Sequence, residues 1–544
     1  MKIRYLLLGI IILASVLRFI NLGQVPYGLS NDESSYIYSA YSLWKTGKGI
    51  DGTFLPLSFN TDSSNSPVPI YLSAPFVGLL GVSPEVGRLP YILLGIGSIF
   101  VLYFLVKELL DNEKIALLSA VVLSVSPWHL HVTRTAYDSV FAMFFLLLGT
   151  YLFVRGVRKG NINWSLISFF LAFYSYHATK FVFLFLLPVL IILFYSKLKE
   201  RKKETLLFVG GYLAILLSFF TIMSFSGVTR QDETLLSYND KKAVSTVNYE
   251  LVKNEAPVAI RKLFNNKPLY FFRVIRENYL EVFSTNFLFL YGDTTSSAVR
   301  LGVLSRGVMY LIELPLLILG LYYLFRRGRT LGTNVIMAGL LTAPLASTFV
   351  SGKSYVFRDL TMTPFLAIIV GCGIYAGYLL IRKYPSIWKK ALSIGFLVLY
   401  SIFTLSYLYQ YHFRYPVYGA EAWDRGNREV TEYLSQKRNE YKHIYFYAPD
   451  APNSPGNIML AQYGIFGRIE PTDIQRAWVT QTPVIGNVTF LDHCPDLLKL
   501  PKMSKKDKTL YIYPVDKCSQ NIAPIYTIHD YGESTIVLWQ IYEI

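Results

Sequence analysis

The chain begins MKIRYLLLGIIILASVLRFINLGQVPYGLSNDE (residues 1–33), in which an apolar run is followed by the acidic pair Asp32-Glu33. The run at 5–21 has the length of a membrane-spanning helix. It lacks a small-residue cleavage site such as Ala-x-Ala, so we expect a retained span rather than a signal peptide. Carboxylates beside a membrane boundary are costly unless water, a cation or a ligand meets them there. We therefore expect the chemistry of this chain to begin at Asp32 and Glu33.

The composition is that of a membrane protein. Of the 544 residues, 53% are hydrophobic and only 16% are charged, and the mean hydropathy is +0.36. In soluble proteins roughly a quarter of the residues are charged. The formal net charge is +16, but Lys and Arg cluster between the apolar runs. This pattern favours membrane topology and anionic lipid over nucleic acid, so we expect no nucleic-acid partner.

Apolar runs of membrane-spanning length recur about eleven times along the chain. They lie at 5–21, 87–106, 114–127, 139–154, 163–177, 180–196, 205–225, 304–325, 333–350, 360–381 and 391–410. The basic clusters between them fall on one side, which the positive-inside rule assigns to the cytoplasm. With Lys2 and Arg4, this predicts a multi-pass protein of the plasma membrane with a cytoplasmic N-terminus. An odd number of spans then places the C-terminus outside the cytoplasm.

Two long external loops are expected, at about 22–86 and 226–303. The stretch PVPIYLSAPFVGLLGVS (67–83) is apolar enough for another span, but its three prolines argue against a regular helix. We interpret it as part of a loop that follows the membrane surface. The stretch LYFFRVIRENYLEVFSTNFLFLYGD (269–293) is aromatic and amphipathic, which is typical of a juxtamembrane helix lying on the bilayer.

From about residue 411 the sequence becomes polar and predicts a small soluble α/β domain, 411–544, after a membrane module, 1–410. A helical pattern at 420–438 precedes strand-like runs at 443–449, 509–514 and 535–544. If this domain lies outside the cytoplasm, Cys494 and Cys518 could form a disulfide. Two unpaired thiols fit the sequence almost equally well.

The acidic pair is expected to open a helix. Asn31 is a good N-cap, and residues 32–44 have an amphipathic helical pattern. Acids in a first helical turn interact favourably with the macrodipole and need no further role. The alternative is that Asp32 is a general base on the outer membrane face, supported by Glu33. Asp138 is expected on the same outer side, where it is either a second functional acid or the N-cap of the next span.

Several cationic groups accompany these acids on the outer side. Arg134 shares the loop of Asp138 with His129 and His131, although no zinc-ligand spacing supports a metal site there. Arg88, Lys180 and Arg358 lie at outer ends of spans, against the positive-inside bias. Each alone is explained by snorkelling or by a salt bridge. Together with the acids, they indicate a phosphate-binding site at the outer leaflet.

In this order the motifs resemble those of the GT-C polyprenyl-phosphate-sugar glycosyltransferases. The match is closest to bacterial relatives of the protein O-mannosyltransferases and the lipid A aminoarabinose transferases. It covers about 1–410 and is specific mainly as an ordered set. The segments that carry it are Asp32-Glu33, Pro67-Val-Pro-Ile-Tyr-Leu, Arg88-Leu-Pro, Asp138, Tyr176-His-Ala-Thr-Lys180, Asn286-Phe-Leu-Phe-Leu-Tyr-Gly-Asp293 and Arg358 to Pro364.

The resemblance implies a polytopic α-helical GT-C enzyme that transfers a sugar from a polyprenyl phosphate to an acceptor outside the cytoplasm, usually with inversion. Asp32 would then deprotonate the acceptor hydroxyl, Glu33 would support it, and Asp138 would orient acceptor or sugar. Lys180 and Arg358 would bind the lipid phosphate. His177, Arg134 and Arg88 are further candidates for that role.

No cofactor is indicated by the sequence. Oligosaccharyl transferases of this fold hold a divalent ion with an Asp-x-Asp motif, and the outer loops lack such a pair, so a metal has no motif to support it. A transporter or flippase of lipid-linked glycans is the alternative function, but it would place polar or broken helices near the membrane midplane. A glycan sensor or assembly protein is a further alternative, although an anchor needs far fewer spans. The sugar and the acceptor are left open.

Overall fold

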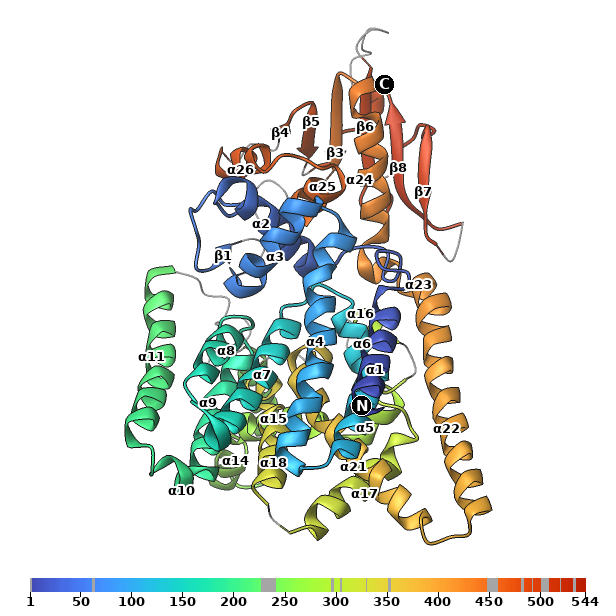
Figure 1. The fold of residues 1–544 in the computed structure, drawn as a ribbon. Helices are drawn as coiled ribbons and strands as arrows, with labels where there is room; N and C mark the ends of the chain where they lie inside the picture. The colour runs from blue at the N-terminus through green and yellow to red at the C-terminus, as the bar shows by residue number, and fades with distance from the viewer. Residues whose placement is uncertain are drawn as a thin grey trace. The chain divides into compact units, whose positions relative to one another are not determined.

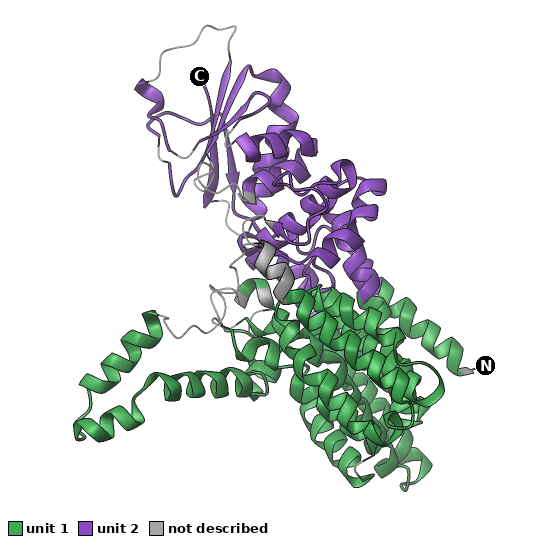
Figure 2. Cartoon of the chain, turned by 90° about the vertical axis from the view of Figure 1, so that its left-hand side faces the viewer, with its two compact units in different colours: residues 1–15, 95–132, 139–404 green, residues 16–94, 133–138, 405–544 purple. Residues whose placement is uncertain are grey.

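The computed structural model is mainly helical, with one small sheet near the C-terminus (Figure 1). It describes residues 2–60, 64–226, 241–294, 298–303, 306–328, 330–350, 354–447, 458–480, 484–491, 493–499, 508–518, 520–531 and 535–544. Parts of the expected segments 226–303, 304–325 and 443–449 lie outside these residues. The chain forms two compact units (Figure 2): unit 1 contains 1–15, 95–132 and 139–404, and unit 2 contains 16–94, 133–138 and 405–544.

Unit 1 is a helical bundle whose helices approach closely where glycines face a neighbouring backbone. A Cβ added to Gly320 or to Gly373 would lie 1.9 Å from a carbonyl oxygen of the partner helix, so α17 and α21 can pack only with glycine there. The helices wholly or mostly in this unit are α1 (Lys2–Phe19), α4 (Pro84–Leu110), α5 (Glu113–Val125), α6 (Pro127–Thr133), α7 (Ser139–Lys159), α8 (Trp164–Phe173), α9 (Thr179–Leu193), α10 (Tyr195–Leu198), α11 (Lys202–Ser226), α13 (Lys241–Val252), α14 (Val258–Phe264), α15 (Lys267–Glu281), the π-helix η1 (Asn286–Leu290), α16 (Ala298–Leu301), α17 (Glu313–Arg326), α18 (Leu331–Thr342), α19 (Leu345–Thr348), α20 (Tyr355–Arg358), α21 (Thr363–Ile381) and α22 (Ser386–Tyr409).

Five helical segments among the described residues are long and apolar enough to cross a membrane. They are Pro84–Leu110, Ser139–Lys159, Leu331–Thr348, Leu360–Ile381 and Ser386–Tyr418. The pair α5 and α6, bent by 58°, makes a sixth if it is one span. Other expected spans correspond to shorter apolar helices, such as α8 with 10 residues and α9 with 15. The chain is therefore a multi-pass membrane protein, while the expected number of about eleven spans is not confirmed.

The proline-rich stretch at 67–83 is helical, which corrects the sequence-based interpretation. Helix α3 (Pro67–Leu80) carries Pro67 and Pro69 in its first turn, where a backbone N–H has no intrahelical partner. Only Pro75 lies in the helix interior. The argument from three prolines failed because two of them occupy positions that tolerate proline.

Unit 2 joins the region from the end of α1 onward to the C-terminal sheet. Its helices are α2 (Asn31–Thr46), α3, α23 (Tyr415–Tyr418), α24 (Arg425–Lys437), α25 (Ile458–Phe466) and α26 (Pro471–Thr480). Its strands are β1 (Phe59–Asn60), β2 (Ser64–Asn65), β3 (His443–Tyr447), β4 (Val484–Ile485), β5 (Val488–Leu491), β6 (Thr509–Pro514), β7 (Tyr526–His529) and β8 (Val537–Glu543).

The C-terminal sheet has six strands in the order β4-β5-β3-β6-β8-β7. Strand β3 runs parallel to β5 and β6, and the other pairs are antiparallel. One face carries Phe446 and Phe490, and Tyr463 of α25 packs on Phe490. The opposite face buries a cluster that includes Tyr511 and Tyr513. The strands expected from the sequence at 443–449, 509–514 and 535–544 correspond to β3, β6 and β8.

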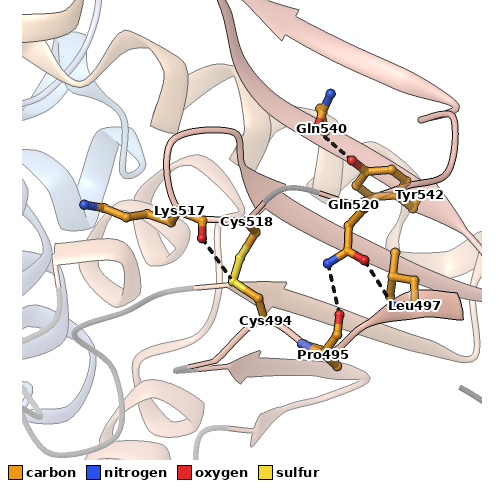
Figure 3. The surroundings of a disulfide bond; sticks show 8 residues. All are labelled: Cys494, Pro495, Leu497, Lys517, Cys518, Gln520, Gln540 and Tyr542. Carbon is orange, nitrogen blue, oxygen red and sulfur yellow. Dashed lines mark hydrogen bonds between the residues drawn. A yellow bond between two sulfur atoms is a disulfide. The ribbon is translucent and has the colours of Figure 1, made fainter. Parts of the chain in front are cut away.

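Cys494 and Cys518 form a disulfide in the C-terminal region (Figure 3). Their Cα atoms are 5.8 Å apart, which is typical of a disulfide. Beside it, the side chain of Gln520 accepts a hydrogen bond from the backbone N–H of Leu497 and donates one to the carbonyl of Pro495. The bridge therefore fixes the segment that covers the tyrosine-rich face of the sheet.

The helices that accompany the sheet also hold α2. The hydroxyl of Tyr38 donates to the carbonyl of Ile469 at 2.9 Å, and the amide of Gln462 donates to the carbonyl of Leu29 at 3.0 Å. Gln475 of α26 donates to Ser42 and to further groups near the end of α2. The compact units thus group α2 with 405–544, which differs from a division of the chain at residue 410.

Candidate active site

Helix α2 begins with a capping box. The backbone N–H of Glu33 donates to Ser30 Oγ at 3.3 Å, and the backbone N–H of Ser30 donates to Glu33 Oε2 at 3.2 Å. The cap is therefore Ser30, one residue before the expected Asn31. A serine followed three residues later by glutamate satisfies two backbone donors, which an isolated Asn cap cannot do.

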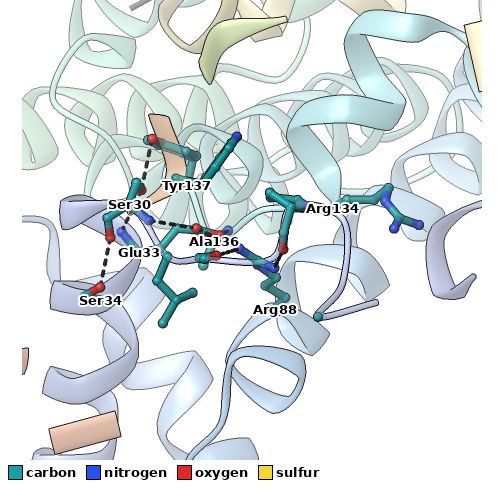
Figure 4. Close-up of polar contacts among 12 residues, drawn as sticks. Ser30, Glu33, Ser34, Arg88, Arg134, Ala136 and Tyr137 are labelled. Atoms are coloured by element: carbon teal, nitrogen blue, oxygen red, sulfur yellow. Dashed lines mark hydrogen bonds and ion pairs between the residues drawn. The ribbon is translucent and has the colours of Figure 1, made fainter. Parts of the chain in front are cut away.

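The Glu33 carboxylate is a buried hub of hydrogen bonds (Figure 4). Besides Ser30, it accepts from Nε and Nη2 of Arg88, both at 2.9 Å, and from the backbone N–H of Ala136 at 2.7 Å. Both side chains of the ion pair are 0% exposed. A charge pair buried in this way is strongly destabilising to break, because the remaining partner is left uncompensated. Helix capping and ion pairing therefore explain why a glutamate is buried at position 33.

The guanidinium of Arg88 donates hydrogen bonds to backbone carbonyls as well as to the Glu33 carboxylate. Nη1 donates to the carbonyl of Pro26 at 2.7 Å and Nη2 donates to the carbonyl of Gly28 at 2.8 Å, in addition to the pair with Glu33. These contacts connect the start of α4 to the segment that leads into α2. Arg88 was expected among the phosphate-binding residues, but its burial and partners support a role in positioning Glu33.

Arg134 is also fully buried. Its guanidinium lies 5.4 Å from the ring centroid of Tyr411 and donates to carbonyl oxygens in the last turn of α1 and in the segment that follows it. A cation there interacts favourably with the C-terminal end of a helix dipole. This arrangement supports a structural role for Arg134 instead of the expected contact with phosphate. The four carbonyls are those of Leu17, Arg18, Asn21 and Val25.

Asp138 is tied to α2 by a residue that the sequence analysis missed. The hydroxyl of Tyr36 donates to Asp138 Oδ2 at 2.6 Å, and Asp138 is only 9% exposed. Burial raises the pKa of Tyr36 well above its ordinary value, and the nearby Asp138 carboxylate raises it further. Tyr36 therefore stays a hydrogen-bond donor at physiological pH. Its position four residues after Asp32, on the same helix face, was the available signal.

Asp32 differs from its neighbour Glu33 in exposure. It lies in the first turn of α2 and is partly accessible to solvent, whereas Glu33 is fully buried. Of the two acids, Asp32 is the one that a ligand can reach. The structure thus separates the pair into a buried structural acid and an accessible one.

In unit 1, two of the expected phosphate-binding residues lie together. Lys180 Nζ lies 3.0 Å from His177 Nδ1, and both side chains are half-buried. The ammonium also lies 4.2 Å from the ring centroid of Phe219 and 5.8 Å from that of Phe173. Aromatic faces attract a cation without neutralising it, so the surroundings of Lys180 favour the presence of a positive charge.

Arg358 lies where two expected motif segments meet. It ends α20 and is half-buried, and the next residue, Asp359, is 0% exposed. At the start of α20, the backbone N–H of Tyr355 donates to Asp293 Oδ2 at 3.0 Å. The segment that ends at Asp293 is therefore in direct contact with α20, the helix that Arg358 ends.

His129 and His131 are buried and have protein partners. His129 Nε2 lies 2.8 Å from Ser98 Oγ, and His131 Nε2 lies 2.9 Å from the carbonyl oxygen of Arg300. Among the residues that the structure describes, no three His, Cys, Asp or Glu side chains gather as metal ligands would. These two histidines are therefore accounted for by packing.

The fold is that of a GT-C membrane enzyme. ArnT from Cupriavidus metallidurans, solved bound to undecaprenyl phosphate, superposes with a TM-score of 0.54 at 11% identity, over 98% of this chain and 97% of that chain. Residues 64–225 match the model of the dolichyl-phosphate-mannose-protein mannosyltransferase family. The resemblance recognised in the sequence is thereby confirmed.

Two proteins of Bacillus subtilis (strain 168), named as candidate mannosyltransferases, are similar over part of the chain. YkcB is 27% identical over 128 residues, which is 24% of this chain and 18% of YkcB. YycA is 30% identical over 153 residues, which is 28% of this chain and 22% of YycA. The similarity thus spans about a fifth of the length of each relative.

Proposed function

We propose that this protein is an inverting membrane glycosyltransferase that moves a monosaccharide from a polyprenyl-phosphate carrier to an acceptor hydroxyl outside the cytoplasm. The observation that carries the proposal is the accessible Asp32 at the start of a helix fixed by the buried pair of Glu33 and Arg88. A general base needs both access to the proton and a fixed position. The match to a mannosyltransferase family model supports the reaction class.

In this mechanism the Asp32 carboxylate accepts the proton of the acceptor hydroxyl. The acceptor oxygen forms a bond to the anomeric carbon while the bond from that carbon to the phosphate oxygen breaks. The electron pair leaves with the polyprenyl phosphate, and the proton on Asp32 is later lost to water. A single displacement of this kind needs one base and inverts the anomeric carbon.

Lys180 and Arg358 in unit 1 are the cations assigned to the lipid phosphate, with His177 supporting Lys180. Cations stabilise the charge that develops on the leaving phosphate. Asp138 is assigned to orienting the acceptor or the sugar. We assign no step to a metal ion.

The proposed location is the plasma membrane, with the N-terminus in the cytoplasm and the C-terminal region outside. The bond between Cys494 and Cys518 supports this orientation, because disulfides persist mainly in oxidising compartments. A sugar donor and an acceptor outside the cytoplasm would then share a compartment with Asp32.

The test is sugar transfer by purified protein in liposomes from a panel of polyprenyl-phosphate sugars to a mixed acceptor set. Asp32→Asn should lower kcat at least about 100-fold, the lower range for loss of a general base. Asp51→Asn is the control, since Asp51 lies in the same unit and accepts hydrogen bonds from the backbone N–H and the hydroxyl of Thr53. NMR of the product should show an inverted anomeric carbon.

Near-normal transfer by Asp32→Asn would remove Asp32 from the role of base. Absence of transfer from every lipid donor, with movement of the intact lipid-linked sugar across the bilayer, would instead identify a flippase.

A further inference from the structure

Three consecutive residues of the segment 136–138 are bonded to α2 and its cap. The backbone N–H of Ala136 donates to Glu33 at 2.7 Å, and the hydroxyl of Tyr137 donates to Ser30 Oγ at 3.1 Å. The third contact is from Tyr36 to Asp138 at 2.6 Å. More than one hundred residues separate these partners in sequence. The segment that carries the second acid is thus attached to the helix that carries the first.

The contact made by Tyr36 differs from the other two because it reaches a carboxylate directly. Tyr36 is 3% exposed, and its oxygen also accepts the backbone N–H of Ser66 at 3.3 Å. The Tyr36 hydroxyl therefore accepts one hydrogen bond from Ser66 while it donates another to Asp138. A short bond from a hydroxyl to an ionised acceptor is stronger than a neutral one and has a narrow geometry. One oxygen of Asp138 is thereby fixed in place.

The position of Tyr36 on α2 places its hydrogen bond to Asp138 on the same helix face as Asp32. Residues four apart lie on one face of an α-helix, about one turn from each other. Asp32 and Tyr36 therefore share a face, and any movement of α2 moves both. The capping box and Arg88 fix the start of the same helix.

We propose that Tyr36 is a positioning residue that holds the Asp138 carboxylate in register with Asp32, so that both acids meet the same hydroxyl-bearing substrate. This inference rests on the proposed function. Displacement of a catalytic group by about 1 Å can cost about 100-fold in rate. Losing the Tyr36 hydroxyl while keeping the ring should therefore reduce turnover without disturbing the binding of the lipid phosphate.

The experiment measures kcat and KM for the lipid donor in the reconstituted enzyme with Tyr36→Phe. We expect kcat to fall about 10-fold or more, with donor KM changed less than about 2-fold. Tyr38→Phe is the matched control, because Tyr38 is a buried tyrosine of the same helix whose hydroxyl donates to the carbonyl of Ile469. It loses a comparable bond away from Asp138 and should keep its kcat.

A double-mutant cycle with Asp138→Asn separates positioning from general loss of stability. In the Asp138→Asn background, Tyr36→Phe should have little further effect on kcat. A normal kcat for Tyr36→Phe, or an equal loss in both backgrounds, would overturn the inference.

The proposed function is judged separately from this inference. If the wild-type protein transfers sugar and Asp32→Asn does not, the proposed function stands whatever the Tyr36 variants do. If the wild-type protein transfers no sugar, the proposed function fails first.

Discussion

Two acids of unit 2 and one cation of unit 1, all candidate site residues, are held in different ways. In unit 2, Glu33 and Asp138 are fixed by short hydrogen bonds from side chains and backbone, several of them between fully buried groups. In unit 1, Lys180 lies beside His177 and near the rings of Phe173 and Phe219, and it is half-buried. The first arrangement fixes the direction of two carboxylates, whereas the second places an ammonium group beside an imidazole and two aromatic faces.

The difference agrees with what each group is proposed to do. Proton transfer requires hydrogen-bond distance and alignment between the base and the hydroxyl. Attraction between a cation and a phosphate falls off only slowly with distance and depends little on direction. Substitutions of the acidic side and then of the basic side test this comparison.

Arg88→Ala should have the largest effect. It leaves the Glu33 carboxylate buried without its cation, which costs about 3–5 kcal/mol. We expect a large drop in the thermal unfolding temperature of the detergent-solubilised protein and loss of transfer. Arg476→Ala is the control, since the ion pair of Arg476 with Asp473 is mostly exposed and such pairs contribute about 0–1 kcal/mol. Equal stability of the two variants would contradict the conclusion that the buried pair of Glu33 and Arg88 stabilises the fold.

Lys180→Ala should act on donor binding instead of on stability. Losing one charge-assisted contact to phosphate is worth about 1.5–3 kcal/mol, so donor KM should rise roughly 10-fold or more. Lys180→Arg keeps the charge and should retain most of the affinity. Steady-state kinetics with varied donor concentration measure this effect. An unchanged donor KM together with reduced kcat would move Lys180 away from the phosphate.

Phe219→Leu should have the smallest effect and tests how the aromatic faces hold Lys180. The ring lies 4.2 Å from the ammonium, and a cation–π contact contributes about 0.5–1 kcal/mol. We expect donor KM to change about 2- to 5-fold in the same assay. Phe170→Leu is the control because this ring is 44% exposed and packs on Tyr174. If both variants behave alike, the ring of Phe219 does not tune Lys180.

The sequence predicted those parts of the fold that local pattern determines. The acidic pair was expected to open a helix, and α2 begins at Asn31 with both acids in its first turn. The strands at 443–449 and 509–514 were expected from short runs rich in aromatic and aliphatic residues. The helix at 67–80 was missed because proline was weighed without regard to its position in the helix.

The contacts that organise the site could not be predicted from spacing. Tyr36 and Asp138 are 102 residues apart, and no local pattern relates a tyrosine in one segment to an aspartate in another. Arg88 and Arg134 were recognised as unusual outer-side cations, but the sequence does not reveal burial. Whether a cation faces a ligand or a carbonyl depends on packing, which only the folded chain shows. The roles of Asp32, Asp138, Lys180 and Arg358 stay predictions.

The bonds between α2 and the C-terminal region have a consequence for synthesis. Tyr38 donates to Ile469, 431 residues later, and Gln475 donates to Ser42 across 433 residues. At about 5–20 residues per second, a ribosome needs roughly 20 to 90 s to supply these partners. During that interval Asp32 and Glu33 have been synthesised, while α2 still lacks its hydrogen bonds to Ile469 and Gln475. A chain that ends before Ile469 lacks both bonds, so α2 gains this support only after Ile469 and Gln475 have been synthesised.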